Sequence, residues 1–219
     1  MLWMTVAYYM IALMAGSIAL NNIYVAIRTD CRITKWMVSC MMVLIVFKYI
    51  GVMLFGMGGQ WYVLEKWKRT LLFSAMGITT SLFFTIHYLY GKKRTAAHQL
   101  VLRLIPLLLF YCLFIVTAKV SIVPSAFLGY EIRLEYYWKL GLGFVQGIVL
   151  LFLVYYTYKA ARTNRDEEAR LRLIFLTFPL VLFLLDGAAQ IINIPFLQPL
   201  SISEVVSLLA TGYGLSYKN

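Results

Sequence analysis

Long apolar runs separated by short polar connections dominate the pattern of this chain. A helix needs about 20 apolar residues to cross a hydrocarbon core of about 30 Å, and most of the runs are long enough. The alternation with period two that marks a membrane barrel is absent, so helices are expected. The runs are Leu2–Ile27, Trp36–Gly58, Thr70–Tyr90, Gln99–Val123, Tyr137–Lys159, Leu173–Ile194 and Ile202–Tyr217. The pattern predicts an all-α, polytopic membrane helix bundle with seven transmembrane helices, forming one domain over residues 1–219.

The first and last runs each admit a second interpretation. Ser17-Ile18-Ala19 fits a signal-peptide cleavage pattern, but no basic residue precedes Arg28 and the apolar run continues past Ala19. We therefore expect a true span. The last run is short and contains Glu204 and two glycines, so it is either a tilted span or an interfacial helix.

Composition and charge agree with a membrane protein. Hydrophobic residues make up 62% of the chain and charged residues 13%, against about 25% charged in soluble domains. The net charge of +11 does not indicate nucleic-acid binding, because the basic residues lie mostly in short loops. The odd-numbered loops are the more basic ones, so we expect them in the cytoplasm. This orientation places the N-terminus outside and the C-terminus in the cytoplasm of a cell membrane.

Lys48 and Asp186 lie in the middle of two apolar runs, which both pass from the inside to the outside. With a rise of 1.5 Å per residue, both are roughly 18–20 Å from the inner face. A charge at this depth costs at least about 2.5–3.5 kcal/mol and usually finds a partner. We expect the two to form a buried ion pair, which either serves a function or only locks two helices together.

Further polar side chains gather around Asp186. Gln190 and Asn193 follow it at i+4 and i+7, so the three residues share one helix face. Pro179 and Gly187 interrupt the same helix, and Gln146 in the fifth run is a candidate to join the site. The stripe is either a ligand cavity or switch, or a set of ordinary hydrogen bonds between helices.

Two loops carry further expectations. The loop from Ser121 to Tyr136 is the longest outer one, and it is either a lid over an outward pocket or a solvated connector. The charged run from Arg162 to Arg172 is expected to be helical and to lead into the sixth span. It is either a solvated helix start or a lever that carries a signal out of the membrane.

Catalytic and metal-binding motifs are missing. The two histidines, His87 and His98, belong to no HExxH motif or His/Asp cluster, and Ser and Cys have no paired base at a usable depth. We therefore expect no bound metal, no cofactor and no enzymatic activity.

Several short motifs resemble the seven-helix N-terminal sensor modules of bacterial histidine kinases and related signalling proteins. The motifs are His87–Arg94, Leu102–Pro106, Tyr158–Arg162 and Glu168–Arg172, followed by Pro179 in the sixth span. The resemblance covers roughly residues 60 to 215. It implies a receptor of a bacterial plasma membrane that passes a stimulus to a cytoplasmic output domain, as in two-component systems, and it implies a homodimer.

Together these observations favour a membrane sensor or receptor that signals to a cytoplasmic domain following Asn219 or to a separate protein. An extracellular or membrane-borne small molecule, or a lipid-like ligand, would bind near Lys48, Asp186, Gln190, Asn193 and Gln146. The bilayer itself is an expected partner, and nucleic acid is not. A small secondary transporter for a polar or charged molecule is the second interpretation, weakened by the lack of symmetry between halves. An intramembrane enzyme comes third, and a structural subunit of a membrane complex comes fourth.

Overall fold

The structure is a computed structural model of the whole chain, and it describes residues 2–55, 61–90, 95–123, 131–192 and 202–216. This part of the chain contains eight α-helices, one 3-10 turn and one pair of short strands. The helices are α1 Leu2–Ile27, α2 Arg32–Phe55, α3 Trp61–Trp67, α4 Phe73–Tyr90, α5 Thr95–Thr117, α6 Tyr136–Thr163, α7 Glu167–Ile192 and α8 Ile202–Leu215. The 3-10 turn η1 covers Thr70–Leu72, and the strands are β1 Val120–Val123 and β2 Glu131–Leu134.

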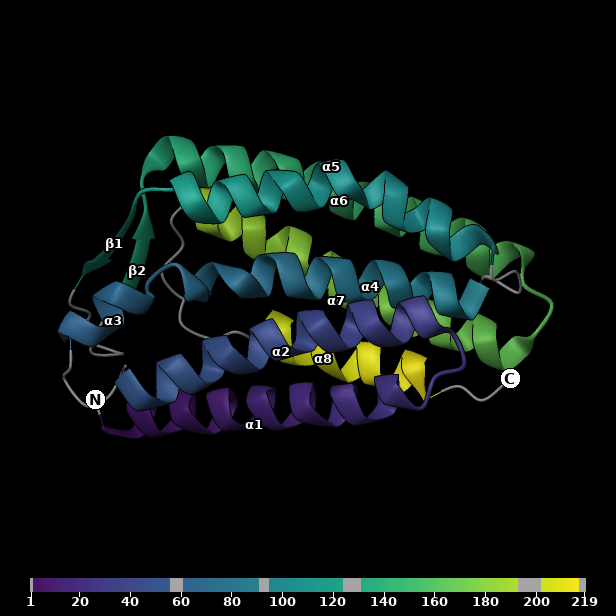
Figure 1. The fold of residues 1–219 in the computed structure, drawn as a ribbon, viewed down its shortest axis with the longest axis horizontal. Helices are drawn as coiled ribbons and strands as arrows, with labels where there is room; N and C mark the ends of the chain where they lie inside the picture. Colours follow the sequence, from purple (N-terminus) through teal and green to yellow (C-terminus); the bar gives the residue numbers. More distant parts are fainter. Residues whose placement is uncertain (1, 56–60, 91–94, 124–130, 193–201, 217–219) are drawn as a thin grey trace.

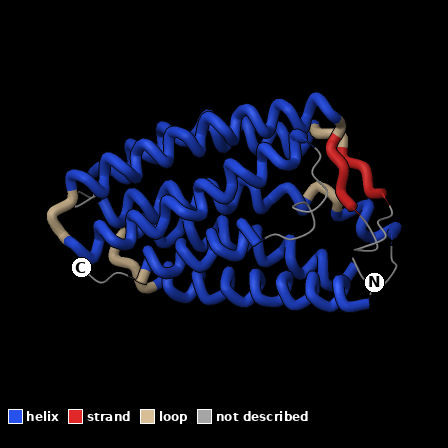
Figure 2. The backbone as a smooth tube through the Cα atoms, turned by 180° about the vertical axis from the view of Figure 1, so that it is seen from behind, coloured by secondary structure: helices blue, strands red, loops and turns tan. Residues whose placement is uncertain are grey.

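The helices form one elongated bundle with alternating directions (Figure 1). The connections α1–α2 and α6–α7 and the end of α8 lie at one end of the bundle, and β1, β2 and α3 lie at the other (Figures 1 and 2). The first of these ends carries several basic residues, including Arg32, Lys35, Arg162 and Arg172. The chain order thus gathers the first and fifth loops at one end.

Helix α4 is the centre of the bundle and packs against α2, α7 and α8. Nearly all of its side chains are buried, although several are hydroxyl residues. Gly77 permits close packing, because a Cβ added there would lie 2.9 Å from the backbone oxygen of Met41 in α2. Small residues also let α1 approach its neighbours, since Ala12, Ala15 and Ala19 are buried in a helix that packs against α2 and α8.

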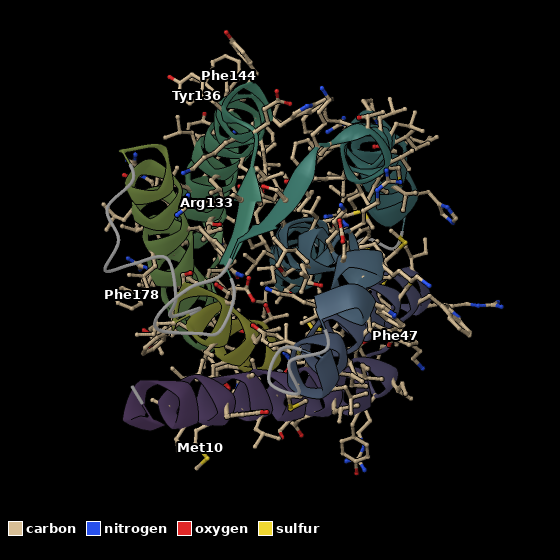
Figure 3. The ribbon with its side chains drawn as sticks, turned by 90° about the vertical axis from the view of Figure 1, so that its left-hand side faces the viewer. Met10, Phe47, Arg133, Tyr136, Phe144 and Phe178 are labelled. Atoms are coloured by element: carbon tan, nitrogen blue, oxygen red, sulfur yellow. The ribbon has the colours of Figure 1, made fainter. Side chains whose placement is uncertain are left out.

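The outer surface of the bundle is apolar. Figure 3 shows the side chains of Met10, Phe47, Phe144 and Phe178 pointing outward on different sides. They are between 48% and 67% exposed, as expected of side chains that face lipid rather than water. Among the described residues, five helices are long and apolar enough to cross a membrane, and α8 is a shorter apolar helix. The chain is therefore a multi-pass membrane protein by the length and composition of its helices.

Helix α7 begins at Glu167 within the charged run, so the predicted helix over Arg162–Arg172 is interrupted at 164–166, between the end of α6 and the start of α7. Asp166 caps it, because its carboxylate accepts the backbone N–H groups of Glu168 and Ala169 at 3.1 and 3.5 Å. The helix continues without a break through Pro179 to Ile192, so the proline does not divide it into two segments.

Three elements at the opposite end of the bundle differ from the predicted loops. Strands β1 and β2 pair in antiparallel register, with Val120 opposite Leu134 and Ser121 opposite Arg133. The predicted span Gln99–Val123 is therefore too long, because its β-branched end forms a strand and α5 ends at Thr117. The short helix α3, which follows α2, is also absent from the sequence prediction.

Candidate functional site

Lys48 lies on α2 and is only 9% exposed. It stands seven residues before Phe55, the last residue of α2, which is about 10 Å along the helix axis. The sequence pattern puts it near the middle of a span, because the apolar run begins at Trp36 and ends at Gly58. The helix itself begins at Arg32 and ends at Phe55, so Lys48 is closer to the end that carries α3 and the strands.

The partner of Lys48 is Glu204, in the first turn of α8. The ammonium nitrogen lies 2.7 and 2.8 Å from the two carboxylate oxygens, and it also donates to the hydroxyl of Ser74 at 2.8 Å. Tyr49, the neighbour of Lys48, donates its phenolic hydroxyl to the same carboxylate. Three helices, α2, α4 and α8, thus contribute to one cluster.

The cluster neutralises two charges in an apolar environment. The side chains of Lys48 and Glu204 are 11% and 15% exposed, so water screens the pair poorly. Taking both ions out of water is expensive, and the hydroxyls of Tyr49 and Ser74 lower that cost by adding hydrogen bonds. The result is a complete polar unit that depends on α8 staying in place.

A second polar contact holds the middle of α8. Asn22 of α1 is 1% exposed and donates its amide to the backbone oxygen of Leu208 at 2.7 Å. Gly212 makes the approach possible, because a Cβ added there would lie 2.3 Å from the amide oxygen of Asn22. The close contact between α1 and α8 therefore requires glycine at this position.

A third contact holds the end of α8. The guanidinium of Arg172 on α7 donates to the backbone oxygen of Tyr213. It also donates to the hydroxyl of Ser216, at 3.0 Å. It also lies 4.4 Å from the centre of the Tyr213 ring and 2.7 Å from the carboxylate of Glu168. A cation at a helix C-terminus satisfies carbonyl groups that have no partner within the helix.

The predicted site residues fall into two groups. Lys48 is buried and paired, as expected of an intramembrane charge, but its described partner is Glu204. Asp186 and Gln190 belong to α7, and Asn193 follows that helix. The side chains of Asp186 and Gln190 and the whole of Asn193 lie outside the described part of the structure. The predicted contact between Lys48 and Asp186 therefore stays a prediction.

Gln146, the last predicted residue, is half-buried on α6. It lies near the hydroxyl of Tyr111, which is also close to Thr79. Tyr111 is 1% exposed, and its hydroxyl has no partner among the described residues that meets the distance and angle of a hydrogen bond. Gln146 thus belongs to a polar contact among α4, α5 and α6.

Glu204 is the residue that sequence reasoning missed. In the sequence it stands out only as an interruption of the seventh run, although a carboxylate within an apolar segment raises the same question as Lys48. A search for a charge at the predicted depth of Lys48 does not select Glu204, because Glu204 lies only about 3 Å from the start of its helix. With the observed bounds of α2 and α8, both charges lie toward the same end of the bundle.

The described residues include no group of three or more His, Cys, Asp or Glu side chains that could hold a metal ion. Comparisons with protein-family models, curated proteins and solved structures find no match. The chain is thus characterised as a multi-helix apolar protein with several candidate membrane spans and a buried ionic cluster between α2 and α8.

Proposed function

We propose that this chain is a seven-helix membrane sensor module in which the Lys48–Glu204 cluster holds α8 in one of two positions. The observation that carries the proposal is the support of α8 by polar contacts from three other helices along its length. Lys48 holds its beginning, Asn22 its middle and Arg172 its end. A change at the first contact would therefore reach the last through a single rigid helix.

In this proposal α7 and α8 complete the set of seven spans. The apolar side chains of Ile174, Phe175 and Phe178 on α7 are exposed, as lipid contact requires. Helix α8 has 14 residues and is about 21 Å long, which is shorter than the hydrocarbon core. Its packing against α1, α4 and α7 permits this, because neighbouring helices cover one face of it and can take up the mismatch in length. The basic end of the bundle faces the cytoplasm, where an output domain or a separate protein would receive the signal.

The ligand would reach the cluster from outside or from the bilayer and compete for one member of the ion pair. Lys48 attracts a carboxylate or phosphate group, and Glu204 attracts an amine. A ligand shifts the helix only by as much as it prefers one arrangement over the other. An ionic ligand group meets this condition, because it replaces a contact that only one arrangement contains.

Hydrogen exchange measured by mass spectrometry on the full chain in lipid nanodiscs tests the proposal. Lys48→Met removes the first contact of α8 and leaves the Asn22 and Arg172 contacts intact. We expect faster exchange throughout α8, including the segment from Thr211 to Leu215, which begins about 10 Å beyond Glu204. Lys68→Met is the matched control, because Lys68 forms a surface pair with Glu65 at 3.3 Å.

Faster exchange confined to the first turn of α8 would mean that the ion pair acts locally and that the helix transmits nothing. A secondary transporter remains the second candidate, because an intramembrane ion pair is also typical of transporters. Uptake of a charged solute by vesicles containing the wild-type chain, abolished by Lys48→Met, would favour transport over sensing.

A further inference from the structure

A cavity opens at the basic end of the bundle, between the α1–α2 connection and the beginning of α5. Its volume is about 610 Å³, within the range of about 300–1,000 Å³ common for small-molecule sites. The residues that line it are Asp30, Cys31, Arg32, Ile33, Trp36, Met37 and His98. It lies at the other end of the bundle from the Lys48–Glu204 cluster, so it is a separate site.

The positions of the helix ends indicate that the cavity lies near the level of the lipid headgroups. Helix α1 ends at Ile27, α2 begins at Arg32 and α5 begins at Thr95, so these helix ends mark the boundary of the apolar core. Trp36 is 67% exposed beside the cavity, and tryptophan is enriched at this level of a membrane. The cavity therefore opens where a phospholipid headgroup would meet it.

Polar and apolar groups divide the lining of the cavity. Arg32 and His98 supply hydrogen-bond donors, and Asp30 supplies a carboxylate. Neither Asp30 nor Arg32 forms an ion pair with another described residue, whereas the nearby Arg28 is engaged with Tyr24. Ile33, Trp36 and Met37 form the apolar part.

We propose that this cavity binds phosphatidylethanolamine, a phospholipid whose headgroup carries both a phosphate and a primary ammonium. Arg32 and His98 hold the phosphate, Asp30 accepts the ammonium, and an acyl chain lies along Trp36 and Met37. The site does not depend on the proposed sensor function.

The charges of the cavity distinguish this lipid from the two obvious competitors. Phosphatidylglycerol offers a phosphate to Arg32 but no cation to Asp30, whose carboxylate would repel it. Phosphatidylcholine carries a cation, but its trimethylammonium group has no N–H to donate to a carboxylate. Only the ethanolamine headgroup, among the three, satisfies both charged side chains.

Native mass spectrometry of the full chain, released from micelles containing equal amounts of the three lipids, tests the proposal. We expect the wild-type chain to retain phosphatidylethanolamine about fivefold more than either of the other two lipids. This ratio corresponds to roughly 1 kcal/mol, the contribution of a partly exposed ion pair between Asp30 and the lipid ammonium. Equal retention of the three lipids by the wild-type chain would overturn the proposal without any variant.

Two substitutions test the two halves of the headgroup. Arg32→Gln should lower the retention of all three lipids, because each of them carries the phosphate, whereas the control Arg162→Gln, which removes an exposed charge from the same end of the bundle, should leave retention unchanged. Asp30→Asn should shift the preference to phosphatidylglycerol, because the repulsion is removed. Unchanged retention in Arg32→Gln, the same loss in Arg162→Gln, or an unchanged preference in Asp30→Asn would refute the assignment.

Discussion

Lys48 shows how far the chemistry of one residue constrains the structure around it. Its ammonium group is buried within an apolar bundle, and its four methylenes allow it to reach a carboxylate on a neighbouring helix. The sequence predicts Asp186 as that partner, whereas the partner that the described residues show is Glu204. The identity of the partner depends on where α2 begins and ends. The observed ends of α2 differ from the predicted ones by four and three residues, and this difference shifts the depth of the charge by about 5 Å.

Removing either member of the pair should destabilise the protein strongly. Lys48→Met leaves the Glu204 carboxylate buried without its cation, and Glu204→Leu leaves the ammonium without its anion. We expect each to cost about 3–5 kcal/mol, because a buried charge is left uncompensated. The double substitution should cost clearly less than the sum, as measured by unfolding in mild detergent.

The pair Lys119–Glu135 is the control for this cycle. Its ammonium and carboxylate are 3.8 Å apart, and its side chains are 78% and 49% exposed. The corresponding substitutions Lys119→Met and Glu135→Leu should change stability by less than about 1 kcal/mol each. Strictly additive losses at Lys48 and Glu204 would show that the two charges do not stabilise each other.

At the scale of elements, apolar periodicity predicts the long helices well and the short elements poorly. All seven predicted runs contain a helix, because a long apolar segment has few other conformations open to it in lipid. The strands β1 and β2 and the helix α3 have four to seven residues each. Segments of this length take their conformation from the residues that pack against them. Val120 of β1, for example, packs in one cluster with Leu72 and Phe114, and the local sequence pattern does not encode such contacts.

Helix α8 offers a test of close packing between elements. Gly212→Ala places a methyl group against the amide of Asn22, which is buried and bonded to Leu208. We expect a loss of about 1–3 kcal/mol, because the amide must move and its hydrogen bond must break. Thermal unfolding in detergent measures it.

Gly147 on α6 is the matched control, because a Cβ added there meets nothing within 4 Å. Gly147→Ala should be neutral or stabilising, since alanine favours a helix over glycine by up to about 1 kcal/mol. If Gly212→Ala were equally harmless, the contact between α1 and α8 would be looser than described, and the middle support of α8 would fail.

At the scale of the whole molecule, the candidate site is predictable only in part. Charge inside an apolar segment identifies Lys48, but pairing it with Glu204 requires the way α8 inserts among α1, α4 and α7. That insertion depends on small residues such as Gly212 and Gly214, whose effect on packing emerges only when the helices are assembled. The polar stripe of Asp186, Gln190 and Asn193 rests on helical spacing alone.

The arrangement of the helices makes the orientation of the molecule testable. The charge pattern predicts that the end of α6 is cytoplasmic and the strand pair is outside, and the two lie at opposite ends of the bundle. In a background with Cys31, Cys40 and Cys112 replaced by serine, we introduce Thr163→Cys at the end of α6 or Ser121→Cys on β1. Both positions are exposed, so a maleimide can reach them from its own side of the membrane.

A membrane-impermeant maleimide added to intact cells should label Ser121→Cys and not Thr163→Cys, and permeabilisation should make both reactive. The expectation follows from the excess of arginine and lysine at the Thr163 end, which favours retention of that end in the cytoplasm. The opposite labelling pattern would place the Lys48–Glu204 cluster near the cytoplasmic face. A ligand from outside would then have to cross most of the bundle, and the proposed direction of signalling along α8 would be reversed.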